Sequence, residues 1–190
     1  MTELKQRSLD EQREEFARGR MTTMPIAGTI VWAALGIAGA ILPSQWAAFA
    51  IFIGTGSIFY LALLVARFTG EDLLGKSRPK NEFDRLFFLS TAMAWLVFAV
   101  AIPFYLVDHT SLPLTVGILT GLMWMPISWI IKHWVGMFHT ISRTLLIVAA
   151  WYLFPDDRFV VIPAVIVAVY LVSIVALEKR WRERQQAGAA

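Results

Sequence analysis

The sequence predicts an all-α fold: a polytopic membrane helix bundle of six transmembrane helices, paired as three hairpins and preceded by a short polar helix. Three observations predict it. Hydrophobic residues make up 57% of the 190 residues and charged residues only 16%, whereas soluble domains are about half apolar and about a quarter charged. The apolar residues are gathered in runs long enough to cross a bilayer. The basic residues lie beside these runs.

The six predicted spans follow from the length of the apolar runs. A transmembrane helix needs about 20 mostly apolar residues, and the stretches that qualify are 22–42, 46–66, 86–107, 112–131, 135–154 and 158–178. Pro103, Pro126 and Pro163 fall inside spans, where each removes a backbone hydrogen bond and is expected to kink the helix. The predicted domains are a polar helix at 1–20, a transmembrane domain at 21–180 and a tail at 181–190.

The positions of Lys and Arg predict the orientation, because these residues gather on the cytoplasmic side of a membrane protein. One side of the membrane is predicted to carry almost all of the basic residues: Lys5, Arg7, Arg13, Arg18 and Arg20 in the N-terminal segment, Arg67, Lys76, Arg78, Lys80 and Arg85 after the second span, Lys132 after the fourth span, and Lys179, Arg180, Arg182 and Arg184 in the C-terminal segment. The opposite side holds Arg158. We therefore expect both termini to face the cytoplasm.

The N-terminal segment is rich in helix-forming residues and carries charges at helical spacings. Its apolar face is thin, with Leu4, Leu9 and Phe16. These features predict a solvated helical leader. A helix that binds a partner or lies on the membrane surface is the alternative.

Small residues predict close helix packing in the first two spans. Ala50 and Gly54 are four residues apart, as are Gly36 and Ala40. Small residues at this spacing let helix backbones approach each other, which is the main attraction between helices in lipid. A glycine-rich phosphate loop is excluded, because no strand precedes the glycines and no lysine follows them. The same faces are compatible with a homo-oligomer.

The stretch WMPISWIIKHWVGMFHTISR, residues 124–143, brings polar side chains into apolar runs. Trp124, Ser128 and Lys132 are four residues apart and would share one helical face, and His139 and Arg143 would share another. These five residues are the candidate ligand-binding residues. A basic, water-accessible pocket made by them would bind an anion or a phosphorylated headgroup.

Arg143 can also be explained without a ligand. It falls about 12 Å inside its predicted span, where a charge costs about 2.5–3.5 kcal/mol. Snorkelling to lipid headgroups would offset this cost, as would a hydrogen bond to a carbonyl group that the predicted Pro126 kink leaves free. Both explanations stay open beside the pocket.

Several chemistries find no support in the sequence. Asp and Glu are missing from the middle of all six predicted spans, which argues against a cation-coupled pump. The histidines His109, His133 and His139 have no cysteine or interior carboxylate to complete a metal site. No nucleophile system, cofactor motif or nucleic-acid motif is present. We predict no catalytic residue, no metal and no cofactor, and membrane lipids rather than nucleic acid as partners.

Three motifs carry a resemblance to a known group of proteins: IGTGSIFYLALLVARF at 53–68, NEFDRLFFLS at 81–90 and MPISWIIKHW at 125–134. With them the chain resembles an uncharacterised family of small bacterial multi-pass membrane proteins, a domain of unknown function. In that group a proline often follows the aromatic residue of the first motif, where this chain has Leu61 after Tyr60. The resemblance implies a location in the bacterial plasma (inner) membrane. It implies no activity.

Three functions remain in competition. The first is a passive or weakly coupled carrier or channel for a small anionic or polar solute, based on the basic faces and the lack of buried carboxylates. The second is a protein or enzyme that binds a lipid headgroup at the inner leaflet. The third is a non-catalytic membrane module that assembles with itself or with a partner. A cavity beside Arg143 would favour the first.

Overall fold

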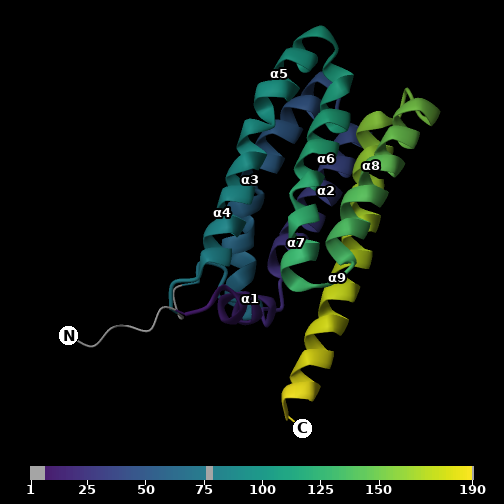
Figure 1. The fold of residues 1–190 in the computed structure, drawn as a ribbon. Helices are drawn as coiled ribbons and strands as arrows, with labels where there is room; N and C mark the ends of the chain where they lie inside the picture. The colour runs from purple at the N-terminus through teal and green to yellow at the C-terminus, as the bar shows by residue number, and fades with distance from the viewer. Residues whose placement is uncertain (1–6, 76–78, 190) are drawn as a thin grey trace.

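The computed structural model describes residues 7–75 and 79–189, and this part of the chain is helical, without a β-strand (Figure 1). Its elements are α1 (Leu9–Ala17), α2 (Thr23–Ile41), α3 (Ser44–Thr69), α4 (Glu82–Leu96), α5 (Phe98–Val107), the 3-10 helix η1 (His109–Ser111), α6 (Leu112–Leu122), α7 (Trp124–Ile131), α8 (Val135–Leu153) and α9 (Arg158–Ala189). The all-α prediction is confirmed here. Leu4, Lys5, Lys76 and Arg78 lie outside the described residues.

Within the described residues, five stretches are long and apolar enough to cross a membrane. They are α2, α3, α4 together with α5, η1 through α7, and α9 up to Ala187. They match five of the six predicted spans. The remaining prediction, 135–154, corresponds to α8, which has 19 residues and is not among the five. Its polar residues, His139, Ser142 and Arg143 among them, lower its hydropathy.

Interruptions divide two of these stretches. α4 gives way to α5 at Val97, and α6 gives way to α7 at Met123. Pro126 accounts for the second break, because it has no N–H group to donate to the carbonyl of Leu122 one turn earlier. α9 continues without interruption through Pro163.

α2 and α9 pack against each other with their backbones nearly in contact. A Cβ atom at Gly39 would lie 2.2 Å from the carbonyl oxygen of Phe159, and one at Gly28 would lie 2.6 Å from the ring of Tyr170. Position 39 therefore requires glycine, because its neighbour is backbone, whereas a side chain at position 28 would displace the Tyr170 ring. Trp32, between them on α2, is fully buried. This helix pair anchors the core, against which α3 and α8 pack.

The predicted small-residue positions occupy different environments. A Cβ atom at Gly54 would lie 3.0 Å from Leu35, and one at Gly36 would lie 3.3 Å from Pro163. Ala50 is half-buried against the core, and Ala40 is exposed. The face of α2 that meets α9 therefore runs through Gly28 and Gly39, and Ala40 lies outside it.

α1 packs against α4 and α7 at the end of the bundle where α9 emerges, here called the α1 end (Figure 1). Ser8 begins the helix with a capping box, since its side chain accepts from Glu11 N and its backbone N–H donates to the Glu11 carboxylate. Phe16 and Ala17 are buried, and the Phe16 ring lies 6.3 Å from that of Phe83. α1 therefore packs on the bundle through Phe16 and Ala17, while Leu9, which was predicted on the same apolar face, is exposed.

Charged side chains hold the segment between α1 and α2 in place. Arg180 on α9 donates to the carbonyl oxygens of Ala17 and Gly19, at 2.7 and 2.6 Å. Arg20 donates to Glu178 at 2.6 Å. This segment is thus fastened to α9, and it lines one end of the cavity described below.

Candidate functional site

Arg143, in the middle of α8, is fully buried and hydrogen-bonded to two neighbouring helices. Its Nε donates to the carbonyl oxygen of Gly117 at 2.7 Å, and Nη2 donates to Thr120 Oγ1 at 3.0 Å. Nη1 donates to the hydroxyl oxygen of Tyr170 at 3.3 Å. The guanidinium therefore joins α8 to α6 and α9. It does not reach the surface, which is inconsistent with the snorkelling explanation.

His139 lies one turn before Arg143 and completes the cluster. Its Nδ1 lies 3.0 Å from Ser173 Oγ and its Nε2 lies 3.3 Å from Arg143 Nη1. Ser173 donates its own proton to the Val169 carbonyl, so it accepts from Nδ1–H, and Nε2 accepts from the guanidinium. The bonds therefore fit a neutral His139 with its proton on Nδ1. Its ring also stacks on Trp124, with centroids 4.5 Å apart.

The sequence GILTG, residues 117–121 on α6, makes room for the guanidinium. A Cβ atom at Gly121 would lie 2.9 Å from Arg143 Cδ. Gly117 leaves its carbonyl open to Nε, and Thr120 presents its hydroxyl to Nη2. The absence of a side chain at Gly121 thus lets Arg143 lie against the backbone of α6, whereas a Cβ atom at Gly117 would meet Ile147 at 3.0 Å.

The positive charge of Arg143 is stabilised by neutral groups and not by a carboxylate. In the part of the chain that the structure describes, its partners are a carbonyl, two hydroxyls and an imidazole. The rings of Trp32 and Tyr170 add cation–π contacts, with Cζ 5.7 and 5.4 Å from their centroids. Neutral groups stabilise a buried cation but do not cancel its field. The region around Arg143 is therefore electropositive.

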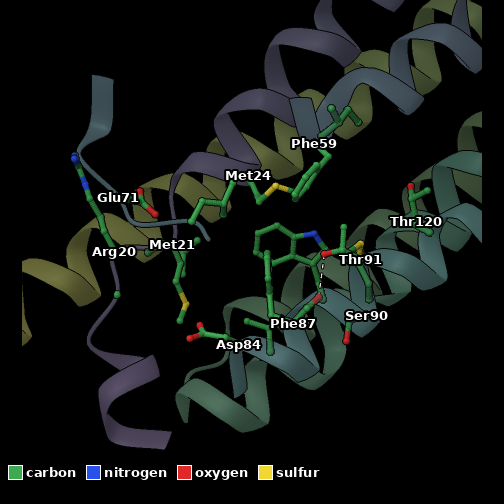
Figure 2. Close-up of a pocket in the computed structure, with 18 of the residues that line it drawn as sticks. Arg20, Met21, Met24, Phe59, Glu71, Asp84, Phe87, Ser90, Thr91 and Thr120 are labelled. Carbon is green, nitrogen blue, oxygen red and sulfur yellow. Dashed lines mark hydrogen bonds between the residues drawn. The ribbon is translucent and has the colours of Figure 1, made fainter. Parts of the chain in front are cut away.

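A cavity of about 510 Å³ extends from the α1 end to the partners of Arg143. Aromatic and Met side chains, among them Met24, Phe59 and Phe87, form much of its wall (Figure 2). Hydroxyl groups and the charged residues Arg18, Arg20, Glu71, Asp72 and Asp84 also line it. Thr120 and Tyr170 line it and bond directly to the guanidinium. Arg143 itself is not part of the wall. A molecule in the cavity would thus feel the charge through two hydroxyl groups.

The end of the cavity next to α1 carries charged side chains. Arg20 and Glu71 lie at this end in Figure 2, away from Thr120. Glu71 is occupied structurally, since one carboxylate oxygen accepts from the N–H groups of Thr22 and Thr23 and from the Thr22 hydroxyl. It caps the N-terminus of α2. Glu71 thus fixes the start of α2 beside the cavity, which Arg18, Asp72 and Asp84 also line.

The structure unites three of the five predicted site residues. Trp124, His139 and Arg143 form one cluster. Ser128 is buried and accepts from the N–H of Met137 at 2.6 Å, which joins α7 to α8. Lys132 is exposed, 3.9 Å from the Glu14 carboxylate on α1.

Ser128 and Lys132 belong instead to a second, shallower groove of about 750 Å³ at the turn between α7 and α8. This groove also holds Trp129, His133 and Trp134. Burial lowers the pKa of His133, and the positive charge of Arg180 lowers it further. The residues of the predicted basic pocket are thus divided between the Arg143 cluster and this groove.

The cluster also contains residues that the sequence pattern did not single out. Tyr170 and Ser173 on α9 and Thr120 on α6 bond directly to Arg143 or His139. The glycines at 117 and 121 could have indicated that α6 packs closely here, because they follow the same four-residue spacing that was used for the first two spans. Tyr170 and Ser173 share one face of α9, but nothing in their local sequence marks them.

Comparison with known proteins identifies a family without a known activity. A family model described as a family of unknown function (DUF7010) matches residues 9–180. No curated protein and no solved structure matches the chain. The match covers α1 through most of α9, and it confirms the resemblance to an uncharacterised family that the three motifs indicated.

Proposed function

Since the chain belongs to the DUF7010 family, a family of unknown function, we propose its function from geometry: it binds a small amphipathic molecule with an anionic group inside the membrane. The cavity of about 510 Å³ that ends at Thr120 and Tyr170 carries this proposal. If the cavity opens at the α1 end, the protein would act as a passive or weakly coupled carrier. The cavity would be loaded from the cytoplasm.

The wall of the cavity favours an apolar or aromatic body. Met and aromatic side chains adapt to ligands of irregular shape and supply much contact area. Pockets for small molecules typically combine such walls with a few polar groups that fix orientation. Here the hydroxyls of Thr55, Ser90 and Thr91 have that character. A purely polar ion would leave most of this wall without a matching surface.

The inner end of the cavity favours a negative group. The Tyr170 hydroxyl oxygen accepts a bond from the Arg143 guanidinium, so its own proton is polarised and remains to donate. Such a donor, backed by a buried cation, stabilises a carboxylate or a phosphate ester more than a neutral acceptor. A cationic ligand would be repelled at this inner end, whereas Glu71, Asp72 and Asp84 line the cavity elsewhere. The proposed anion site therefore has the Tyr170 hydroxyl as its donor, because the Thr120 hydroxyl already donates to the Val116 carbonyl at 2.6 Å.

The proposal includes six crossings of the bacterial inner membrane, as three hairpins with cytoplasmic termini. α8 would be the sixth crossing. It packs against α6, α7 and α9, and Arg143 is fully buried, so α8 has a hydrophobic surround although its own composition is less apolar. The α1 end would face the cytoplasm, in keeping with its arginines and lysines.

Three aromatic probes of equal size test the proposal: benzoate, benzyl alcohol and benzylamine. A ligand that binds only the folded protein raises its thermal unfolding midpoint. We expect benzoate to raise the midpoint of the purified protein most and benzylamine least. Tyr170→Phe should abolish the advantage of benzoate. Tyr105→Phe is the matched control, because Tyr105 packs on Phe52 and does not line the cavity.

Either of two results would contradict the proposal. Equal stabilisation by benzylamine and benzoate would exclude an electropositive binding end. An undiminished benzoate effect in Tyr170→Phe would move the site elsewhere.

A further inference from the structure

We propose that the groove at the turn between α7 and α8 binds one anionic phospholipid. Its phosphate would lie against Lys132 and Trp134, and an acyl chain would lie along Met125 and Met137. This site is separate from the cavity, and it does not depend on what the cavity binds. Arg143 and His139, both fully buried, have no part in it.

The groove has an apolar part and a polar end, as a phospholipid does. Leu122, Met125, Pro126 and Met137 form the apolar part. Lys132 and His133 lie at the other end, where the chain turns. Trp129 and Trp134 flank that end and are 66% and 53% exposed. Exposed indoles next to a lysine are typical of the level of the lipid headgroups, so the phosphate would lie at this end.

The polar end is positively charged overall. Glu14 lies 3.9 Å from Lys132 and 3.5 Å from Arg184, so one carboxylate faces two cations. Arg13 adds a third cation, with its guanidinium 4.2 Å from the centre of the Trp129 ring. Glu183, which also faces this region, pairs with Lys179. A negative headgroup would complete the charge balance.

The Lys132 backbone caps α7 by donating to the Ser128 carbonyl, but its ammonium group takes no part in that cap. Arg13 donates to the carbonyl oxygens of Trp129 and Ile130 and so satisfies two of the helix's last acceptors. The Lys132 backbone is left-handed, with φ 51°, a conformation that glycine or asparagine adopts more readily. A lysine here carries a backbone cost and presents its ammonium group outward, 60% exposed.

His133 can donate a hydrogen bond to the same phosphate. Its Nδ1 accepts from the N–H of Val135 at 3.4 Å, which leaves the proton on Nε2. The neutral ring therefore offers one donor beside the Lys132 ammonium group. Together they would hold a phosphodiester without needing a second full charge.

Lys132→Asn is the variant that tests the site, because asparagine tolerates the left-handed backbone and removes the charge. Purified protein in detergent is titrated with phosphatidylglycerol or with phosphatidylcholine of the same acyl chains, and the unfolding midpoint is recorded. We expect phosphatidylglycerol to stabilise the parent protein more than phosphatidylcholine does. Lys132→Asn should weaken the phosphatidylglycerol response about fivefold, the effect of one lysine near a headgroup.

Two matched variants separate a built site from general attraction. Lys179→Gln removes a cation outside the groove that is 77% exposed, against 60% for Lys132, and should change the response less than twofold. Glu14→Gln breaks the ion pair of Lys132 but leaves the cation, so binding should be unchanged or tighter. If Lys179→Gln weakens the response as much as Lys132→Asn does, or if Lys132→Asn has no effect, the proposal is wrong.

Two further probes fix the kind of ligand. Inorganic phosphate should produce no Lys132-dependent stabilisation, and if it reproduces the lipid effect the site is one for free phosphate. Phosphatidylglycerol with brominated acyl chains should quench tryptophan fluorescence, and Trp134→Phe should reduce that quenching. Unchanged quenching in Trp134→Phe would place the lipid elsewhere.

Discussion

A Cβ atom at Gly121 would lie 2.9 Å from Cδ of Arg143, so the guanidinium reaches its partners because α6 has no side chain at this position. The contact joins α6 to α8. It also makes the position of the buried charge sensitive to one methyl group.

Gly121→Ala should therefore destabilise the protein by about 1–3 kcal/mol, the usual effect of overpacking a fixed site. Thermal unfolding in detergent measures it. Gly56→Ala is the control, because a Cβ atom there would meet no other atom within 4 Å and alanine is the better helix former. Equal stability of Gly121→Ala and the parent would mean that Arg143 is not held as described.

Arg143→Lys keeps the charge but should still impair the protein. Lysine cannot reproduce the separate bonds to Gly117, Thr120 and Tyr170. Each buried acceptor left unsatisfied costs about 1–3 kcal/mol, so we expect a loss of at least about 2 kcal/mol and a loss of the benzoate response. A Lys variant with parental stability and response would show that only the charge matters.

Glu71→Ala should destabilise the start of α2. The carboxylate accepts from two backbone N–H groups and one hydroxyl at the N-terminus of that helix, and loss of such a cap costs about 0.5–2 kcal/mol. Glu183→Ala removes an exposed carboxylate that makes a single 3.9 Å ion pair and should change stability by less than about 0.5 kcal/mol. Equal effects in the two variants would refute a capping role for Glu71.

The crossing of α8 can be tested because the chain has no cysteine. Single-cysteine variants His133→Cys and Asp156→Cys place thiols on either side of α8. In intact bacterial cells, a membrane-impermeant maleimide should label Asp156→Cys, and should label His133→Cys only after lysis. Labelling of both variants in intact cells would rule out a crossing between them.

The local patterns of the sequence predicted the helices and part of the site. Residues four apart on α8, His139 and Arg143, do act together. The prediction for Lys132 assumed that the helix of Trp124 and Ser128 continues through it, but α7 ends at Ile131 and Lys132 turns away with a left-handed backbone. A periodicity argument holds only as far as its helix extends.

Contacts between distant helices were beyond such patterns. Tyr170 is 27 residues from Arg143 in the chain, and its role depends on how α9 rotates against α8. The cavity likewise depends on how far α3 and α4 lie from α6, α7 and α9. The sequence of a single helix does not determine that distance. The depth of Arg143 was predictable, and a bond to a carbonyl group was one of the predicted compensations, although the carbonyl is that of Gly117 and not one left free by Pro126. The two hydroxyls and the imidazole were not predicted.

The cavity is proposed to admit water and to end in an electropositive region set by Arg143. Met123 lines the cavity between α6 and α7, and Met123→Cys would be the only thiol in the chain. The direct measurement is its rate of reaction with an anionic and with a cationic methanethiosulfonate, each relative to a small free thiol. We predict faster reaction with the anionic reagent, and loss of this preference when Arg143→Leu is added. A thiol that reacts with neither reagent, or a preference that persists without Arg143, would contradict the account.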